Sequence, residues 1–249
     1  MLEDGEIVTV VITVSTLSYL WTLMDDILQK RYHMGREDSE NILSLGHAIV
    51  TLQLMDSNLK HLDPATFNPT NKSKLLEELG MIFSCSYFLY DTFRWKFRGP
   101  ASKIMLCHHI CSIFAIVNNL AGKCWGTHGN MALLVLEGSN PLLHLRRILI
   151  GEGLQSNKLI YKITEWAFLL SFIFFRFGLG VQYVIFIRYS NAPNYLVKTA
   201  YMLFAISSVF LVRIVIILKA KILAVLEGND QKISHTPCSK HLDHIKPIQ

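Results

Sequence analysis

The sequence is poor in charge: only 17% of its 249 residues are charged, while 51% are hydrophobic. A soluble domain of this length needs more polar surface, so the composition indicates that apolar side chains face lipid. The formal net charge is +5, but the Lys and Arg residues sit mostly in short segments between apolar runs. That placement indicates which side of the membrane each loop faces, and it does not predict a nucleic-acid partner.

The sequence has no cysteine spacing that predicts a metal or disulfide site, and we expect no cleavable signal peptide. The five cysteines have no spacing typical of a zinc site or a disulfide framework. The N-terminus, MLEDGE, is acidic where a cleavable signal peptide would be basic, so we expect the first apolar run to remain as a helix. We expect residues 1–30 to form an N-terminal transmembrane helix, 31–220 a transmembrane bundle and 221–249 a flexible polar cytoplasmic tail.

Long apolar runs dominate what is present. Because about 20 apolar residues cross the hydrocarbon core, the sequence predicts an all-α fold, a polytopic transmembrane bundle of about seven helices. The second and fifth segments are short and polar, and must pack inside the bundle if they span. The seven segments are residues 5–24, 42–58, 79–95, 103–121, 128–145, 160–188 and 195–218.

Lys and Arg fall unevenly on the two sides of this seven-helix arrangement. The loops after the first, third and fifth helices and the C-terminal tail hold 16 of them, and the other side holds 6. The positive-inside rule then predicts a lumenal or extracellular N-terminus and a cytoplasmic C-terminus. The one N-glycosylation sequon, Asn71-Lys72-Ser73, falls on the lumenal side of this arrangement.

Ionisable side chains at membrane depth are costly, and each one suggests a functional site. In the fourth segment, His108, Ser112, Ala115 and Asn119 share one helical face, and His109 points about 100° away from His108. The ionisable residues expected at membrane depth are His47, Asp91, His108, His109, Glu137, His144, Glu165, Arg176 and Arg213.

In the fifth segment, Glu137, Asn140 and His144 share a face. Pro141 removes a backbone donor and should kink the helix there, which frees carbonyls near these polar groups. A carboxylate and an imidazole in such a cavity could perform acid/base chemistry or hold a polar head group. Alternatively, His108, Asn119, Glu137 and Asn140 hydrogen-bond one another and hold two helices together.

The arginines and histidines leave further alternatives. Arg176 and Arg213 either pair with Asp91, Glu137 or Glu165, or present a guanidinium to a lipid phosphate or carboxylate. No metal site is expected, since the adjacent histidines have no further ligand at metal-binding spacing.

The third to fifth segments resemble the TLC-domain family, which includes the ceramide synthases and a set of smaller TLC domain-containing membrane proteins. The likeness is carried by SYFLYDTFRW with Tyr90-Asp91, LCHHICSI with His108-His109, LEGSNPLL with Glu137, Ser139 and Pro141, GHA at Gly46–Ala48, and FFRFG with Arg176. In ceramide synthases the double histidine is followed by His-Asp and a second Asp. Here those three positions hold Leu136, Glu137 and Asn140, and no homeobox-like segment is present, which is closer to the smaller branch.

The resemblance implies a TLC-like bundle of the endoplasmic reticulum or plasma membrane that binds, senses or adjusts membrane lipid. Arg176, Arg213, Asn140 and His144 would then line the ligand site. The alternative it implies is a ceramide-synthase-like N-acyltransferase with acyl-CoA as co-substrate. In that case His108 or His109 is base or nucleophile, Glu137 orients it, and Asp91 shapes the polar end. A transporter is disfavoured because no inverted repeat is visible.

Overall fold

Helices make up almost all of the computed structural model, which describes residues 4–60, 72–94, 99–154 and 159–226. The described helices are α1 (Asp4–Arg31), α2 (Arg36–Lys60), α3 (Leu75–Arg94), α4 (Gly99–Gly122), α5 (Gly126–Glu137), α6 (Asn140–Gly151), α7 (Leu159–Ile173), η1 (Phe174–Leu179), α8 (Gly180–Tyr189) and α9 (Asn194–Leu226).

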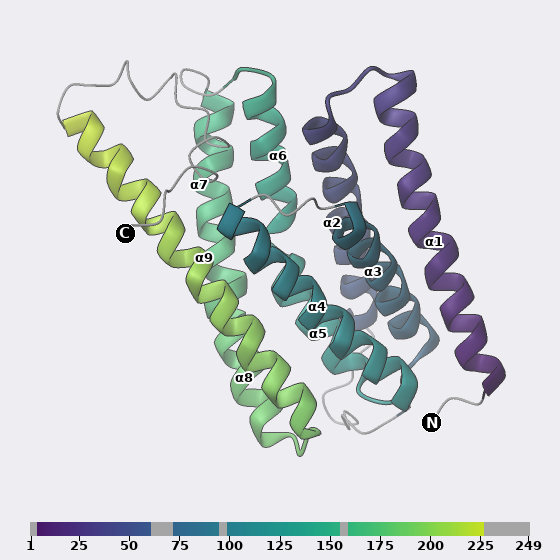
Figure 1. The fold of residues 1–249 in the computed structure, drawn as a ribbon. Coiled ribbons are helices and arrows are strands. Elements are labelled where there is room, and N and C mark those ends of the chain that lie inside the picture. Colours follow the sequence, from purple (N-terminus) through teal and green to yellow (C-terminus); the bar gives the residue numbers. More distant parts are fainter. Residues whose placement is uncertain (1–3, 61–71, 95–98, 155–158, 227–249) are drawn as a thin grey trace.

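These helices form seven continuous rods that alternate in direction, because α5 runs into α6 and α7 runs through the π-helical turn η1 into α8 (Figure 1). Each rod matches one of the seven segments expected from the sequence, with residue 95 of the third segment outside the described residues. The all-α, seven-helix prediction is therefore confirmed. The fifth rod is interrupted at Gly138 and Ser139, just before Pro141, as the kink prediction requires. The Asn71 sequon and residues 227–249 of the expected tail lie outside the described residues.

Four stretches in the described part of the chain are long and apolar enough to cross a membrane: Gly5–Arg31, Lys103–Gly122, Leu159–Tyr189 and Asn194–Lys219. They expose many large apolar side chains, as lipid-facing helices do. The chain is therefore an integral, multi-pass membrane protein.

The other three rods are more polar, and α3 is the most deeply buried of them. α3 packs against α1, α2, α4 and α5, and α2 packs against α3, α5 and α6. These rods, α2, α3 and α5–α6, carry most of the buried polar side chains. Polar helices of this kind need neighbours that cover them, and the outer apolar helices provide that cover.

Candidate functional site: a buried histidine cluster

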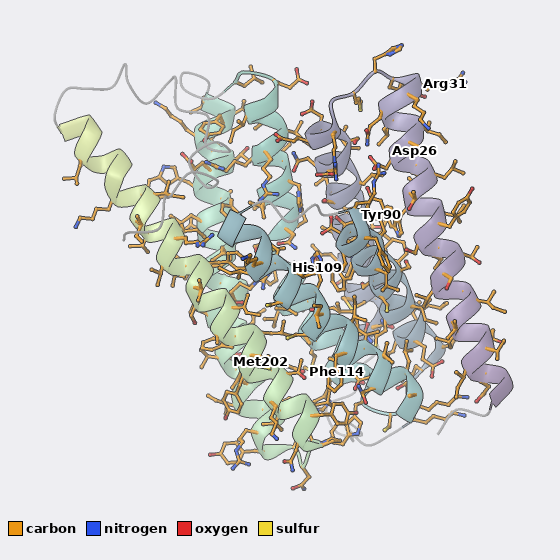
Figure 2. All side chains as sticks on the ribbon, in the orientation of Figure 1. Asp26, Arg31, Tyr90, His109, Phe114 and Met202 are labelled. Atoms are coloured by element: carbon orange, nitrogen blue, oxygen red, sulfur yellow. The ribbon has the colours of Figure 1, made fainter. Side chains whose placement is uncertain are left out.

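Two of the buried carboxylates each approach a different imidazole. α3 presents Asp91 to His109 on α4, with Asp91 Oδ2 3.3 Å from His109 Nδ1. The two side chains are buried. Figure 2 labels His109 on α4, far from the Arg31 end of α1. The pair therefore has the geometry of a carboxylate that fixes the orientation of an imidazole.

Glu137, at the end of α5, forms the second pair. Its Oε2 accepts a hydrogen bond from Asn140 Nδ2 at 2.7 Å and lies 3.8 Å from Nδ1 of His47 on α2. The other ring nitrogen of His47, Nε2, is 3.1 Å from Thr51 Oγ1. The 3.8 Å separation is too long for a hydrogen bond, but it places a carboxylate beside an imidazole where water has little access.

A single aromatic ring joins these pairs. Phe88, 1% exposed, lies 5.5 Å from the ring of His47, 6.4 Å from that of His108 and 5.1 Å from that of His109, measured between centroids. We call His47, His108 and His109, with Asp91 and Glu137, the histidine cluster. It draws one side chain or more from each of α2, α3, α4 and α5.

Arg176 borders the cluster from η1. Its guanidinium donates to the Leu136 carbonyl and, at 3.2 Å, to Ser207 Oγ on α9, and it attracts Glu137 electrostatically. The last carbonyls of a helix have no partner within it, so Arg176 supplies the donor that the break after α5 requires. These two hydrogen bonds tie η1, α5 and α9 together beside the histidines.

The close approach of η1 depends on Gly138. A Cβ added there would collide with the ring of Phe175, the neighbour of Arg176. π-helical turns inside α-helices are frequent at functional sites. A small cavity of about 20 Å³ opens beside Arg176 between α5, α8 and α9, enough for a water molecule.

The remaining expected site residues lie further out. His144 Nδ1 is 3.4 Å from Asn41 Oδ1 on α2, outside the histidine cluster. Glu165 pairs with Arg146 at 3.0 Å instead of with Arg176. Arg213 makes no hydrogen bond or ion pair with another described residue, and nothing joins it to the histidine cluster.

His47 is the cluster member that helix-face analysis did not assign to the site. Spacing within one helix does not reveal that His47 lies beside Glu137, which is 90 residues further along the chain. The available signals were the intramembrane position of His47 and its place in the GHA motif. The expected mutual bonding of His108, Asn119, Glu137 and Asn140 occurs only between Glu137 and Asn140.

The chemistry available is that of paired acids and bases. Asp91 can hold His109 in one tautomer, so that His109 accepts or delivers a proton at its other nitrogen. Glu137, 3.8 Å from His47, instead places a carboxylate charge beside that imidazole. Arg176 offers a fixed positive charge close by. Among the residues that the structure describes, no three His, Cys, Asp or Glu side chains converge as a metal site would need.

A family model described as the TLC domain matches residues 9–224, which is most of the chain. The match includes every member of the histidine cluster and Arg176. It begins within α1 and ends near the end of α9. The chain belongs to the TLC-domain family of multi-pass membrane proteins.

Proposed function

We propose that the protein binds membrane lipid at the histidine cluster and thereby adjusts the lipid composition of its membrane. The observation that carries the proposal is the burial of three imidazoles, two carboxylates and Arg176 in one place within a membrane-spanning bundle. A bundle that needed only cohesion could use apolar packing, which is often as stable as buried ion pairs. Intramembrane charges instead mark sites that act on a ligand.

The ligand site in this proposal lies between the cluster and Arg176. Arg176 and Asn140 would contact the polar head. The cavity beside Arg176 holds about one water, so an acyl chain would reach its apolar lining only when the helices around it move apart. His144 and Arg213 would act only in a state that brings them closer. We place the protein in the endoplasmic reticulum or plasma membrane, with its N-terminus lumenal or extracellular and its C-terminus cytoplasmic.

A second candidate function is N-acyl transfer from acyl-CoA to a long-chain amine, favoured by the 3.3 Å contact between Asp91 and His109. With Asp91 orienting it, His109 would take a proton from the amine as the nitrogen attacks the thioester carbonyl. The C–N bond forms, the C–S bond breaks, and the proton leaves with the CoA thiol. His108 would serve if the substrate enters from its side, with Glu137 aligning His47.

The experiment that separates these functions uses purified protein in lipid nanodiscs. Lipid retained per folded protein and acyl transfer from acyl-CoA are measured for wild type, His108→Ala, His109→Ala and Glu137→Ala. His128→Ala is the matched control, since His128 is a fully buried imidazole outside the cluster.

Lipid loss confined to the three cluster variants, without turnover in wild type, supports binding. Turnover in wild type that the same variants abolish supports the acyltransferase. If the cluster variants and the control lose folding together and retain lipid equally when folded, the cluster is structural and both functions are excluded.

Orientation has its own test. Glycosylation at Asn71 in microsomes is expected from the proposed topology, and modification of a sequon-bearing tag at the C-terminus would contradict it.

A further inference from the structure

α4 has two faces of opposite character. One is an exposed apolar stripe of Ile110, Phe114 and Val117, which are 53%, 51% and 50% exposed; Figure 2 labels Phe114 on it. The other, which we call the polar stripe, consists of His108, Ser112, Ala115 and Asn119. Its three polar members are only 3%, 3% and 1% exposed. The apolar stripe suits lipid, so the polar stripe faces the protein interior.

Each polar member of the polar stripe has an atom without a hydrogen-bond partner in the described structure: His108 Nδ1, Ser112 Oγ and Asn119 Oδ1. Leaving one such buried atom unpaired forfeits the hydrogen bond that it would make to water in the unfolded chain. Native proteins rarely tolerate that loss, and ordered water commonly meets the need when protein atoms do not. Three unmet atoms on one helical face therefore point to partners of one kind along that face.

The spacing along the helix suits water. His108 and Ser112 are one turn apart, about 6 Å between Cβ atoms, a gap that one water can bridge. Ala115 keeps the next turn small, and Asn119 lies about 16 Å along the axis from His108 at 1.5 Å per residue. No single head group covers that length, whereas a file of waters does.

The polar stripe runs from the histidine cluster toward one end of the bundle. Asn119 is near the end of α4 where Lys123 pairs with Glu6 at the start of α1, and His108 belongs to the histidine cluster. Asn119 and Met81 both pack against Gly129, since a Cβ added at Gly129 would touch the amide nitrogen of one and the sulfur of the other.

We propose that the polar stripe of α4 binds a file of water molecules that connects the histidine cluster to the end of the bundle where Lys123 and Glu6 meet. The file satisfies the three unpaired atoms and gives His108 a path for water and protons. It goes beyond lipid binding, because it stands whether or not the cluster takes a lipid.

Radiolytic hydroxyl labelling of the full chain in nanodiscs tests the file, since radicals formed from bound water modify adjacent side chains. Met81 and Met55 are both fully buried, so they form a matched pair. We expect Met81 to label several-fold faster than Met55, and His108 several-fold faster than the protein-bonded His47. Equal rates within both pairs would overturn the proposal.

Ser112→Ala supplies an independent arm. If water satisfies the hydroxyl, its removal lowers the melting temperature, as expected for Ser84→Ala, whose hydroxyl bonds Thr51. It should also slow the labelling of His108. A dry, unpaired hydroxyl behaves oppositely: Ser112→Ala would then raise the melting temperature and leave His108 labelling unchanged, which contradicts the file.

Discussion

Two buried polar regions of this bundle differ in how fully their hydrogen bonds are met. Near the start of α3, Glu77 accepts from the Lys74 backbone N–H at 2.9 Å and from Thr127 Oγ1 at 2.6 Å. Asn130 donates to the Gly126 carbonyl at 2.8 Å and accepts from Asn58 at 3.2 Å. We call Asn58, Glu77, Thr127 and Asn130 the Glu77 network.

The histidine cluster and its surroundings are less complete. His108 Nδ1, Ser139 Oγ and Arg176 Nε are buried without a partner in the described structure. Satisfied networks rigidify and specify a packing, while unsatisfied groups retain capacity to bind. The comparison teaches that buried polarity in this bundle is of two kinds: the Glu77 network has its hydrogen bonds met within the protein, and the surroundings of the cluster keep unmet groups, which the proposed function assigns to a ligand.

The largest expected effect belongs to the Glu77 network. Glu77→Ala removes two hydrogen bonds to a buried carboxylate and leaves their donors unpaired, so we expect a loss of about 3 kcal/mol in stability. Thermal unfolding in detergent measures it. Lipid retained per folded molecule should not change; loss of lipid with unaltered stability would reverse the roles assigned to the two regions.

Gly138→Ala is next, because the new Cβ would meet the Phe175 ring. We expect about 1–3 kcal/mol of destabilisation from overpacking, measured by thermal unfolding. Gly46→Ala is the control, since nothing lies within 4 Å of a Cβ there. Phe175→Leu in the Gly138→Ala background should recover part of the loss, and equal effects of the two glycine variants would exclude the close contact.

Arg176→Lys keeps the charge but cannot reproduce the guanidinium fork that reaches both Leu136 and Ser207. We expect a loss of about 1–2 kcal/mol, again by thermal unfolding. Arg213→Lys, which removes no hydrogen bond within the described structure, should change stability little. A larger effect at Arg213 would remove the structural role given to Arg176.

The smallest effect on stability is expected at the Asp91 and His109 pair. Asp91→Asn keeps the shape and one acceptor oxygen, so unfolding should shift by less than about 1 kcal/mol. Lipid retention, or turnover if present, should nevertheless fall several-fold, since the carboxylate no longer fixes the imidazole. Full retention with this variant would show that the pair is not used.

Much of the fold follows from the sequence. Long apolar runs predict four of the rods, and the shorter segments between the loops predict the other three. Pro141 predicts the break between α5 and α6, because proline cannot donate a helix hydrogen bond. The burial of Glu137, His108 and His109 follows from the same argument. The sequence does not reveal the π-helical turn at Phe174–Leu179, since its register depends on packing against Gly138.

The side-chain pairs between helices could not be predicted from the sequence either. The carboxylate of Glu137 is closest to His47 rather than to the adjacent histidines, and Glu165 is taken by Arg146. Both outcomes depend on which helices become neighbours. Helical periodicity indicates which side chains share a face, but it does not indicate what that face meets.

The central claim, that the cluster holds a ligand while the Glu77 network holds the fold, is tested most directly by lipid retained per folded molecule in Glu137→Gln and Glu77→Gln, measured by native mass spectrometry. We predict that Glu137→Gln folds with near wild-type stability and loses most bound lipid, while Glu77→Gln is destabilised but keeps its lipid when folded. Wild-type lipid retention in folded Glu137→Gln would contradict the account.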